Sequence, residues 1–191
     1  MSDRIGVPGV SPRSAWTPTV RPGAAAPANG MPSESATLRV AYLVEQFPRL
    51  SETFVLDEIR GHARNGLEVT VLSLYRAPDE ELSAARLSRR AMPARVINVF
   101  RFRSGMRRYA EKLLRSALGL AASPRLWRVL FEPGFGTLGD RANIVALAGA
   151  VRQNPGLRSL DLLHCHFGQN GRYGVALRRL GSIGGPVLTT F

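Results

Sequence analysis

Short apolar runs alternate with longer amphipathic stretches from residue 38 onward, and this pattern predicts an α/β fold. Residues 38–44 (LRVAYLV) form a nearly continuous apolar run, which is typical of a strand buried on both faces of a parallel sheet. The next stretch carries apolar side chains at helical spacing, namely Val55, Leu56, Ile59 and Ala63. Ser51 is the expected N-cap of this helix, with Glu52 in its first turn, and Asn65-Gly66 is its expected end. A second apolar run at residues 67–74 completes a β-α-β unit, whose crossover should be right-handed.

The rest of the chain continues the alternation. Strands are expected at residues 94–100, 159–168 and 185–191, and helices at residues 101–121, 123–131, 139–156 and 170–182, whereas residues 75–92 are charged and loop-like. The helix at 101–121 is amphipathic, with Met106, Tyr109, Leu113, Leu114, Ala117 and Leu120 on one side and Arg107, Arg108, Lys112 and Arg115 on the other. Two interpretations remain open for it: a buried apolar side with a solvated basic face, or a helix lying on anionic lipid.

Domain organisation follows from composition. Residues 1–37 are rich in Pro, Gly, Ala, Ser and Thr without any period, which predicts a disordered tail. Residues 38–191 suffice for one α/β domain. The last apolar run has no helix or polar segment after it, so we expect this domain to be incomplete and the chain truncated.

The net charge of +12 comes almost entirely from arginine, since Lys112 is the only lysine. Either a GC-rich genome or attraction to an anionic partner would explain this bias. Nucleic acid is disfavoured as that partner, because the arginines are spread over the chain and no nucleic-acid motif is present. The single cysteine, Cys165, excludes an internal disulfide. No apolar stretch approaches the ~20 residues of a membrane span and no secretory signal is recognisable, so a cytoplasmic location is expected.

Two loops hold the candidate chemistry, because ligands of open α/β sheets bind outside the carboxyl ends of the strands. The first loop carries the polar residues Glu45, Arg49, Ser51, Glu52 and Thr53 beside a helix start, which favours a hydroxyl-rich ligand. The second loop begins with His164 and His166, which share a strand face. We expect a structural role for His164 and a ligand-facing role for His166, and we disfavour metal binding because no third ligand is visible. The spaced glycines Gly168, Gly171 and Gly174 serve either an anion or sugar, or close helix–strand packing.

Three segments carry a family resemblance. Residues 38–74 contain F-P-x-x-S-E-T-F, then E-I and N-G-x-E-V; residues 161–168 contain D-x-x-H-x-H-F-G; residues 185–191 read GPVLTTF. Together they resemble bacterial family-4 glycosyltransferases of the exopolysaccharide and colanic-acid type. The resemblance implies the N-terminal half of a GT-B enzyme, a Rossmann-like parallel sheet with helices on both faces. It also implies retaining sugar transfer from a nucleotide-sugar, without a cofactor or an essential metal.

The resemblance assigns the acceptor side of the cleft to this chain, with a glycan or lipid-linked sugar as the acceptor. The residues expected to line it are Phe47, Ser51, Glu52, Thr53, His166 and Gly168. The catalytic histidine of the family would follow Phe191 and the donor domain is absent, so the chain alone is expected to be inactive. Peripheral contact with the inner membrane face through residues 101–120 is a further expectation. The alternative is a non-catalytic α/β binding module or a relic of such an enzyme.

Overall fold

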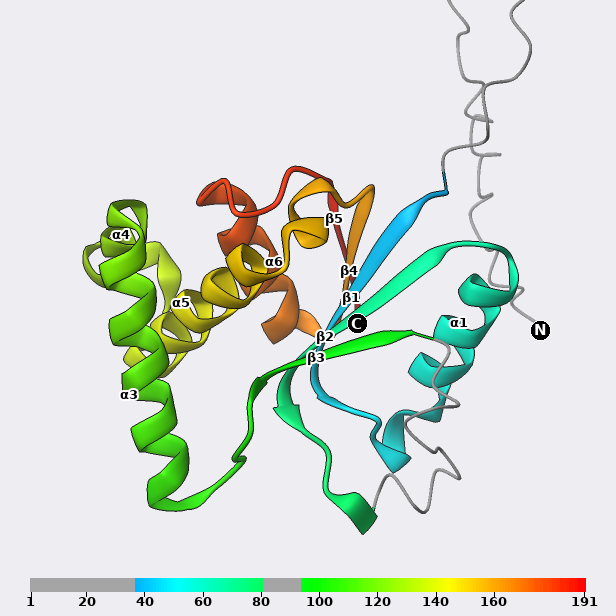
Figure 1. Ribbon diagram of the computed structural model, residues 1–191, viewed down its shortest axis with the longest axis horizontal. Coiled ribbons are helices and arrows are strands. Elements are labelled where there is room, and N and C mark those ends of the chain that lie inside the picture. The colour runs from blue at the N-terminus through cyan, green and yellow to red at the C-terminus, as the bar shows by residue number, and fades with distance from the viewer. Residues whose placement is uncertain (1–36, 81–93) are drawn as a thin grey trace, which may run out of the picture. The chain divides into compact units, whose positions relative to one another are not determined.

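The computed structural model describes residues 37–80 and 94–191. All but the last residue of the expected tail at 1–37, and most of the charged stretch at 75–92, therefore lie outside the described residues. The described chain builds a five-stranded sheet in which every strand pair is parallel. The strands are β1 (Arg39–Phe47), β2 (Glu68–Arg76), β3 (Arg95–Phe100), β4 (Leu162–His166) and β5 (Val187–Thr190). Their order, β3-β2-β1-β4-β5 (Figure 1), reverses direction between β1 and β4 and confirms the expected Rossmann-like α/β fold.

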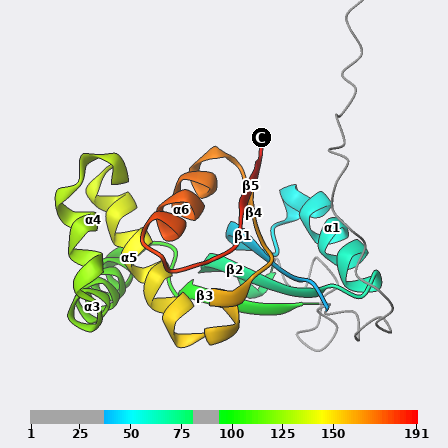
Figure 2. The ribbon, with the colours of Figure 1, turned by 90° about the horizontal axis from the view of Figure 1, so that it is seen from above.

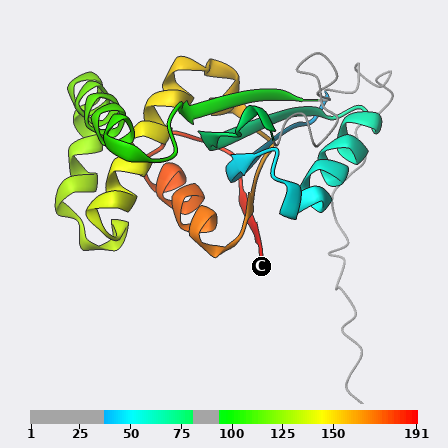
Figure 3. The same cartoon turned by 90° about the horizontal axis from the view of Figure 1, so that it is seen from below.

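Helices cover both faces of this sheet (Figures 2 and 3). The α-helices are α1 (Thr53–Arg64), α3 (Gly105–Ala122), α4 (Arg128–Phe131), α5 (Leu138–Gln153) and α6 (Gly168–Arg179). Short 3-10 helices are η1 (Leu50–Glu52), η3 (Pro124–Trp127), η4 (Pro133–Phe135) and η5 (Pro155–Ser159). Among the α-helices that the structure describes in full, α1 lies on one face, whereas α3, α4, α5 and α6 lie on the other. Within the described ranges, no helix has both the length and the apolar character needed to cross a bilayer.

Two apolar cores follow from the alternation of side chains along the central strands. Ala41 and Leu43 of β1 point to the face covered by α5 and α6 and join the larger core, whereas Tyr42 and Val44 join the core under α1. The expected stripe on α1 is confirmed, because Val55, Leu56 and Ile59 are buried and Ala63 packs beside them. The sheet therefore separates two layers, and successive residues of one strand point alternately into the two cores.

The entry to α1 differs from its expected geometry. Strand β1 continues to Phe47, so part of the predicted loop is sheet. Ser51 lies inside η1, and the N-cap position of α1 is taken by Glu52, whose side chain makes no capping hydrogen bond. The expectation that Ser51 caps the helix, with Glu52 in its first turn, is therefore wrong. The 3-10 turn follows the change of direction after Pro48 and moves the helix start by one residue, from Glu52 to Thr53.

Helix α3 reverses the expected arrangement. Arg108 and Lys112 face the sheet, where their cationic groups lie 5.1 Å and 5.9 Å from the centre of the Tyr75 ring. Burial lowers the pKa of Lys112, and neighbouring Arg108 lowers it further. The apolar side of the helix is instead exposed at Met106, Tyr109, Leu113, Leu114 and Leu118. A buried apolar side with a solvated basic face is thus contradicted over most of the helix, because cation–π contacts hold Arg108 and Lys112 inward. It holds only at the ends, where Arg107 is exposed and Leu120 packs against the larger core.

The spaced glycines of α6 allow close packing of this helix on the sheet. A Cβ built on Gly174 would lie 2.6 Å from Cys165 Sγ and 2.9 Å from Val187 Cγ1, and one on Gly171 would lie 2.5 Å from Thr189 Oγ1. Real Cβ atoms essentially never approach so closely, so neither position accepts a larger residue without a shift. Of the two interpretations left open, close helix–strand packing accounts for Gly171 and Gly174.

Candidate functional site

A pocket of about 280 Å³ opens at the carboxyl ends of the central strands. It lies where the strand order reverses, which is the position that ligands occupy in open α/β sheets. Its lining residues come from the ends of β1 and β2, from η1, and from α3, α5 and the start of α6. They are Glu45, Arg49, Glu52, Leu74, Tyr75, Arg108, Asn143, Phe167, Gln169, Asn170 and Tyr173. We call this the switch-point pocket.

One wall of the switch-point pocket is the polar segment after β1. The Arg49 guanidinium lies 3.0 Å from Glu52 Oε1 and 4.0 Å from Glu45 Oε2, so it bridges two carboxylates along this wall. Glu45 is half exposed and Arg49 about a third, which leaves both side chains accessible from the pocket. The wall thus presents an alternation of acceptors and donors, which suits sugar hydroxyls better than an isolated anion.

The opposite wall is a hydrogen-bonded network around Tyr173. The Tyr173 hydroxyl donates to Asp140 Oδ1 at 2.8 Å and accepts from Asn143 Nδ2 and Gln169 Nε2, both at 3.0 Å. Burial raises the pKa of Tyr173, so it remains a neutral donor. Burial alone would raise the pKa of Asp140, but hydrogen bonds from Thr137 and Tyr173 outweigh it and lower that pKa. The network connects α5 to α6 along this wall.

Unpaired polar atoms remain at the base of the switch-point pocket. Asn143 Oδ1 and Arg108 Nε are buried and have no hydrogen-bond partner among the described residues. The Arg108 guanidinium does donate through Nη2 to the Tyr75 hydroxyl at 3.0 Å. Buried polar groups in proteins are normally satisfied, and exceptions concentrate where a water or ligand belongs. One acceptor and one donor are therefore left over in a pocket that opens to solvent.

Phe167 stands at the rim of the pocket in an unusual backbone conformation. It has φ 68° and ψ 146° at the N-cap of α6, a region that non-glycine residues rarely occupy. Its N–H donates to Thr190 O at 2.8 Å, and its ring lies edge-on to that of half-exposed Phe54. Such strained residues cluster at ligand sites, where neighbouring structure fixes them.

The residues predicted to line the site are divided between several locations. Glu52 lines the switch-point pocket, whereas Ser51 and Thr53 are exposed beside it. Gly168 lies on the other side of α6, in a shallow pocket of about 270 Å³ with Phe191. Phe47 and His166 are only 4% and 2% exposed, so their side chains offer almost no surface to a ligand in the cleft.

His166 belongs instead to a partly buried group under α1, which we call the histidine cluster: Tyr42, Glu58, His62, His164 and His166. Glu58 Oε1 lies 3.0 Å from His164 Nδ1, and Glu58 Oε2 lies 3.4 Å from His166 Nε2. The Tyr42 hydroxyl donates to Glu58 Oε1 at 2.9 Å and also contacts His62 Nδ1. Burial lowers the pKa of His166, as does neighbouring His164, while Glu58 opposes the shift. His166 is therefore mainly a neutral imidazole near pH 7.

Sequence reasoning missed most of the pocket wall and three members of the histidine cluster, namely Tyr42, Glu58 and His62. Gln169, Asn170 and Tyr173 lie among the spaced glycines Gly168, Gly171 and Gly174, which are the stronger local signal. A usable signal for Glu58 was its i, i+4 spacing from His62, next to the buried stripe of α1. Its approach to His164 depends on the pairing of β1 with β4, which no local pattern reveals.

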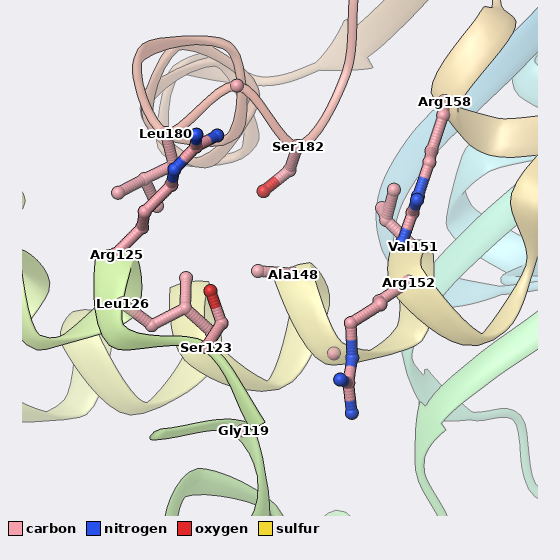
Figure 4. Close-up of a pocket in the computed structure, with 12 residues that line it drawn as sticks. Gly119, Ser123, Arg125, Leu126, Ala148, Val151, Arg152, Arg158, Leu180 and Ser182 are labelled. Carbon is pink, nitrogen blue, oxygen red and sulfur yellow. The ribbon is translucent and has the colours of Figure 1, made fainter. Parts of the chain in front are cut away.

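A second pocket, of about 210 Å³, is lined by three exposed arginines, Arg125, Arg152 and Arg158 (Figure 4). It lies where α3, α5 and α6 end, so carbonyl groups and the negative ends of helix dipoles surround it. Arg152 Nη1 donates to Ala122 O at 3.2 Å, which satisfies one such carbonyl. Arg152 therefore stabilises the end of α3, and the pocket lacks the positive backbone environment of an anion site.

Comparisons of the chain with models of protein families, with curated protein sequences and with solved structures find no match.

Proposed function

We propose that this chain is the acceptor-binding half of a GT-B glycosyltransferase that transfers a sugar from a nucleotide-sugar, with retention, to a glycan or lipid-linked acceptor. The observation that carries the proposal is the polar pocket at the strand-order reversal, bordered by the F-P-x-x-S-E-T-F and H-x-H-F-G segments. Only the acceptor side is assigned to this sequence, because its 191 residues contain no E-x7-E pair for a nucleotide-sugar.

The chemistry of the switch-point pocket favours a saccharide. Carboxylates, a guanidinium, amides and a phenol alternate around it, and hydroxyl groups of a sugar both donate and accept. The exposed aromatic ring of Phe167 adds apolar surface that can cover a sugar ring. A nucleotide is less suitable, since the loop after β1 contains no glycine-rich phosphate turn.

Binding to an array of bacterial oligosaccharides and diphospho-linked sugars tests the proposal, with NMR titration of the strongest binder. Arg108→Ala should weaken binding about tenfold or more, because one hydrogen bond from a charged donor contributes about 1.5–3 kcal/mol. Arg125→Ala, in the pocket of Figure 4, is the matched control and should leave binding unchanged. If no saccharide binds, or if both variants weaken binding equally, the acceptor assignment is wrong. Sugar transfer from UDP-glucose or GDP-mannose by this chain alone would contradict the acceptor-only assignment.

Helix α3 supports a membrane-bound acceptor. Its exposed apolar stripe, defined as Met106, Tyr109, Leu113, Leu114 and Leu118, follows helical spacing and lies along the solvent side of the helix. The exposed arginines Arg101, Arg103 and Arg107 flank the N-terminal end of this stripe. Each cation near an anionic leaflet contributes about 1 kcal/mol, so we propose peripheral binding to anionic lipid.

Flotation with phosphatidylcholine vesicles, with and without phosphatidylserine, tests this contact. Leu113→Glu should reduce binding about 10- to 100-fold, because burial of one leucine contributes about 1.5–3 kcal/mol. Val175→Glu on α6 changes another exposed apolar residue outside the stripe and serves as the control. Binding that ignores phosphatidylserine, or that survives Leu113→Glu, would remove the membrane role.

A non-catalytic binding module remains the alternative function. It would bind the same saccharides in the switch-point pocket, but adding a donor-binding domain of the GT-B type would not produce transfer. Reconstitution with such a domain therefore separates the two functions, whereas saccharide binding alone does not.

A further inference from the structure

The histidine cluster brings together every histidine of the chain, although His62 and His164 are 102 positions apart. We propose that Glu58, His164 and His166 form a binding site for a divalent transition-metal ion, with Zn²⁺ as the ion that fits best. The carboxylate comes from α1 and both imidazoles come from the end of β4. Two histidines and one glutamate form a known donor set for zinc with an open fourth position.

The separations between the donor atoms suit one ion. Bonds of ~2.0–2.1 Å at tetrahedral angles place two ligand atoms about 3.3 Å apart. Glu58 Oε1 lies 3.0 Å from His164 Nδ1, and the other carboxylate oxygen, Oε2, lies 3.4 Å from His166 Nε2. All three donor atoms fall within 4.8 Å of one another, and rotation about the broad χ2 torsion of histidine can shorten the remaining separation.

His166 provides the second observation that indicates a ligand. Its side chain is 3% exposed, yet Nε2 has no hydrogen-bond partner among the described residues. Glu58 Oε2, at 3.4 Å, lies beside this nitrogen without the geometry of a hydrogen bond. A buried imidazole nitrogen that points at a carboxylate and remains unpaired is the arrangement expected of a metal ligand.

A supporting hydrogen bond is present on the far side of both rings. Thr190 Oγ1 lies 3.1 Å from His166 Nδ1 and 3.4 Å from His164 Nε2. A hydroxyl oxygen has two lone pairs, so it can accept from both rings when their opposite nitrogens bind an ion. Metal-binding histidines usually have such an acceptor, which fixes the tautomer and orientation of the ring.

The position of the cluster also indicates what the ion does. It joins α1 to β4, and β4 pairs directly with β5, which carries Thr190. The Glu58 side chain is 31% exposed and provides an entry path, whereas both histidines are buried. The ion would therefore stabilise the packing of α1 on the sheet. This role is separate from saccharide binding and does not depend on the proposed function.

Titration of the 191-residue protein with Zn²⁺ and with Co²⁺ tests the proposal. We expect one ion per chain, a visible d–d spectrum of Co²⁺ in a low-coordinate site, and a rise in Tm that depends on ion concentration. Thr190→Val keeps the shape of the side chain and should weaken Zn²⁺ binding 10- to 100-fold, the usual effect of removing a supporting partner. His164→Gln, His166→Gln and Glu58→Gln should weaken it further.

His62→Gln is the matched control, because it removes the third histidine of the cluster without removing a proposed ligand. It should retain the Co²⁺ spectrum and a Zn²⁺ affinity close to that of the unchanged protein. Circular dichroism establishes that each variant is folded. Absence of one-to-one binding, binding retained in folded His166→Gln, or equal loss in His62→Gln and His166→Gln would each overturn the site.

Discussion

Replacing Gly174 by alanine adds one methyl group where α6 lies against the sheet. The new Cβ would lie 2.6 Å from Cys165 Sγ, 2.9 Å from Val187 Cγ1 and 3.3 Å from Leu163 Cδ2. None of these atoms is the end of a long flexible side chain, and valine is stiff about χ1. Helix α6 must therefore move away from the strands, or the side chains of Cys165 and Val187 must leave their rotamers.

The magnitude follows from two opposing contributions. An extra methyl in a well-packed core costs about 1–3 kcal/mol, whereas alanine is favoured over glycine inside a helix by about 0.5–1 kcal/mol. Gly149, inside α5, has no atom within 4 Å of a built Cβ, so Gly149→Ala brings only the favourable contribution. The difference between the two variants isolates the packing contribution of about 1–3 kcal/mol.

Urea unfolding of both variants, followed by circular dichroism, measures this difference directly. A loss of 1 kcal/mol corresponds to a Tm lower by about 2–4 °C for a domain of this size, so thermal melts provide a second reading. Equal m-values are required for the comparison. If Gly174→Ala proves as stable as Gly149→Ala, the helix is not held close to the strands and the packing role of the glycine is wrong.

Three further results are expected from single sites. Thr137→Ala should lower the free energy of unfolding by about 0.5–2 kcal/mol, because Thr137 and Asp140 form the capping box of α5. Ser104→Ala is the control and should leave it unchanged, because Ser104 makes no side-chain capping bond at α3. Equal effects of the two substitutions in urea melts would contradict this role of Thr137. Because the pKa of Asp140 is lowered on folding, its contribution to the free energy of unfolding is complete above the ordinary pKa of 3.8 and is lost as pH falls through the pKa of the folded protein. Asp140→Asn should therefore show a shallower decline of stability in acid. An unchanged decline of stability in acid would contradict the assignment. Burial raises the pKa of the Cys165 thiol to about 12, so iodoacetamide should label this thiol only after unfolding in guanidinium. Stoichiometric labelling of the native protein would contradict its burial.

The sheet could be predicted from sequence because its signals are local. Continuous apolar runs located all five strands, and the right-handed crossover rule made the first two parallel. The start of α1 could not be located in the same way, since Ser51 satisfies the preference for a cap while the chain forms a 3-10 turn there. Cap statistics do not include the change of direction that the preceding strand imposes.

Side-chain environments were less accessible than element types. The amphipathic pattern of α3 fits either orientation, and only the rings of Tyr75 and Phe100 explain why Arg108 and Lys112 lie inward. The histidine cluster needed the pairing of β1 with β4, which brings Tyr42 opposite His164. Such long-range register leaves no periodic trace in the sequence.

The backbone conformation of Phe167 can distinguish a relic without a ligand from a protein that still binds a saccharide. A residue held at φ 68° raises the free energy by about 1–3 kcal/mol, and glycine would remove most of this strain. In a relic without a ligand, drift toward glycine at this position would improve stability and meet no opposition. In a protein that covers a sugar ring with Phe167, selection for binding would oppose that drift. A library randomised at position 167 and selected for stability alone should therefore enrich glycine, whereas selection for saccharide binding should retain the aromatic ring.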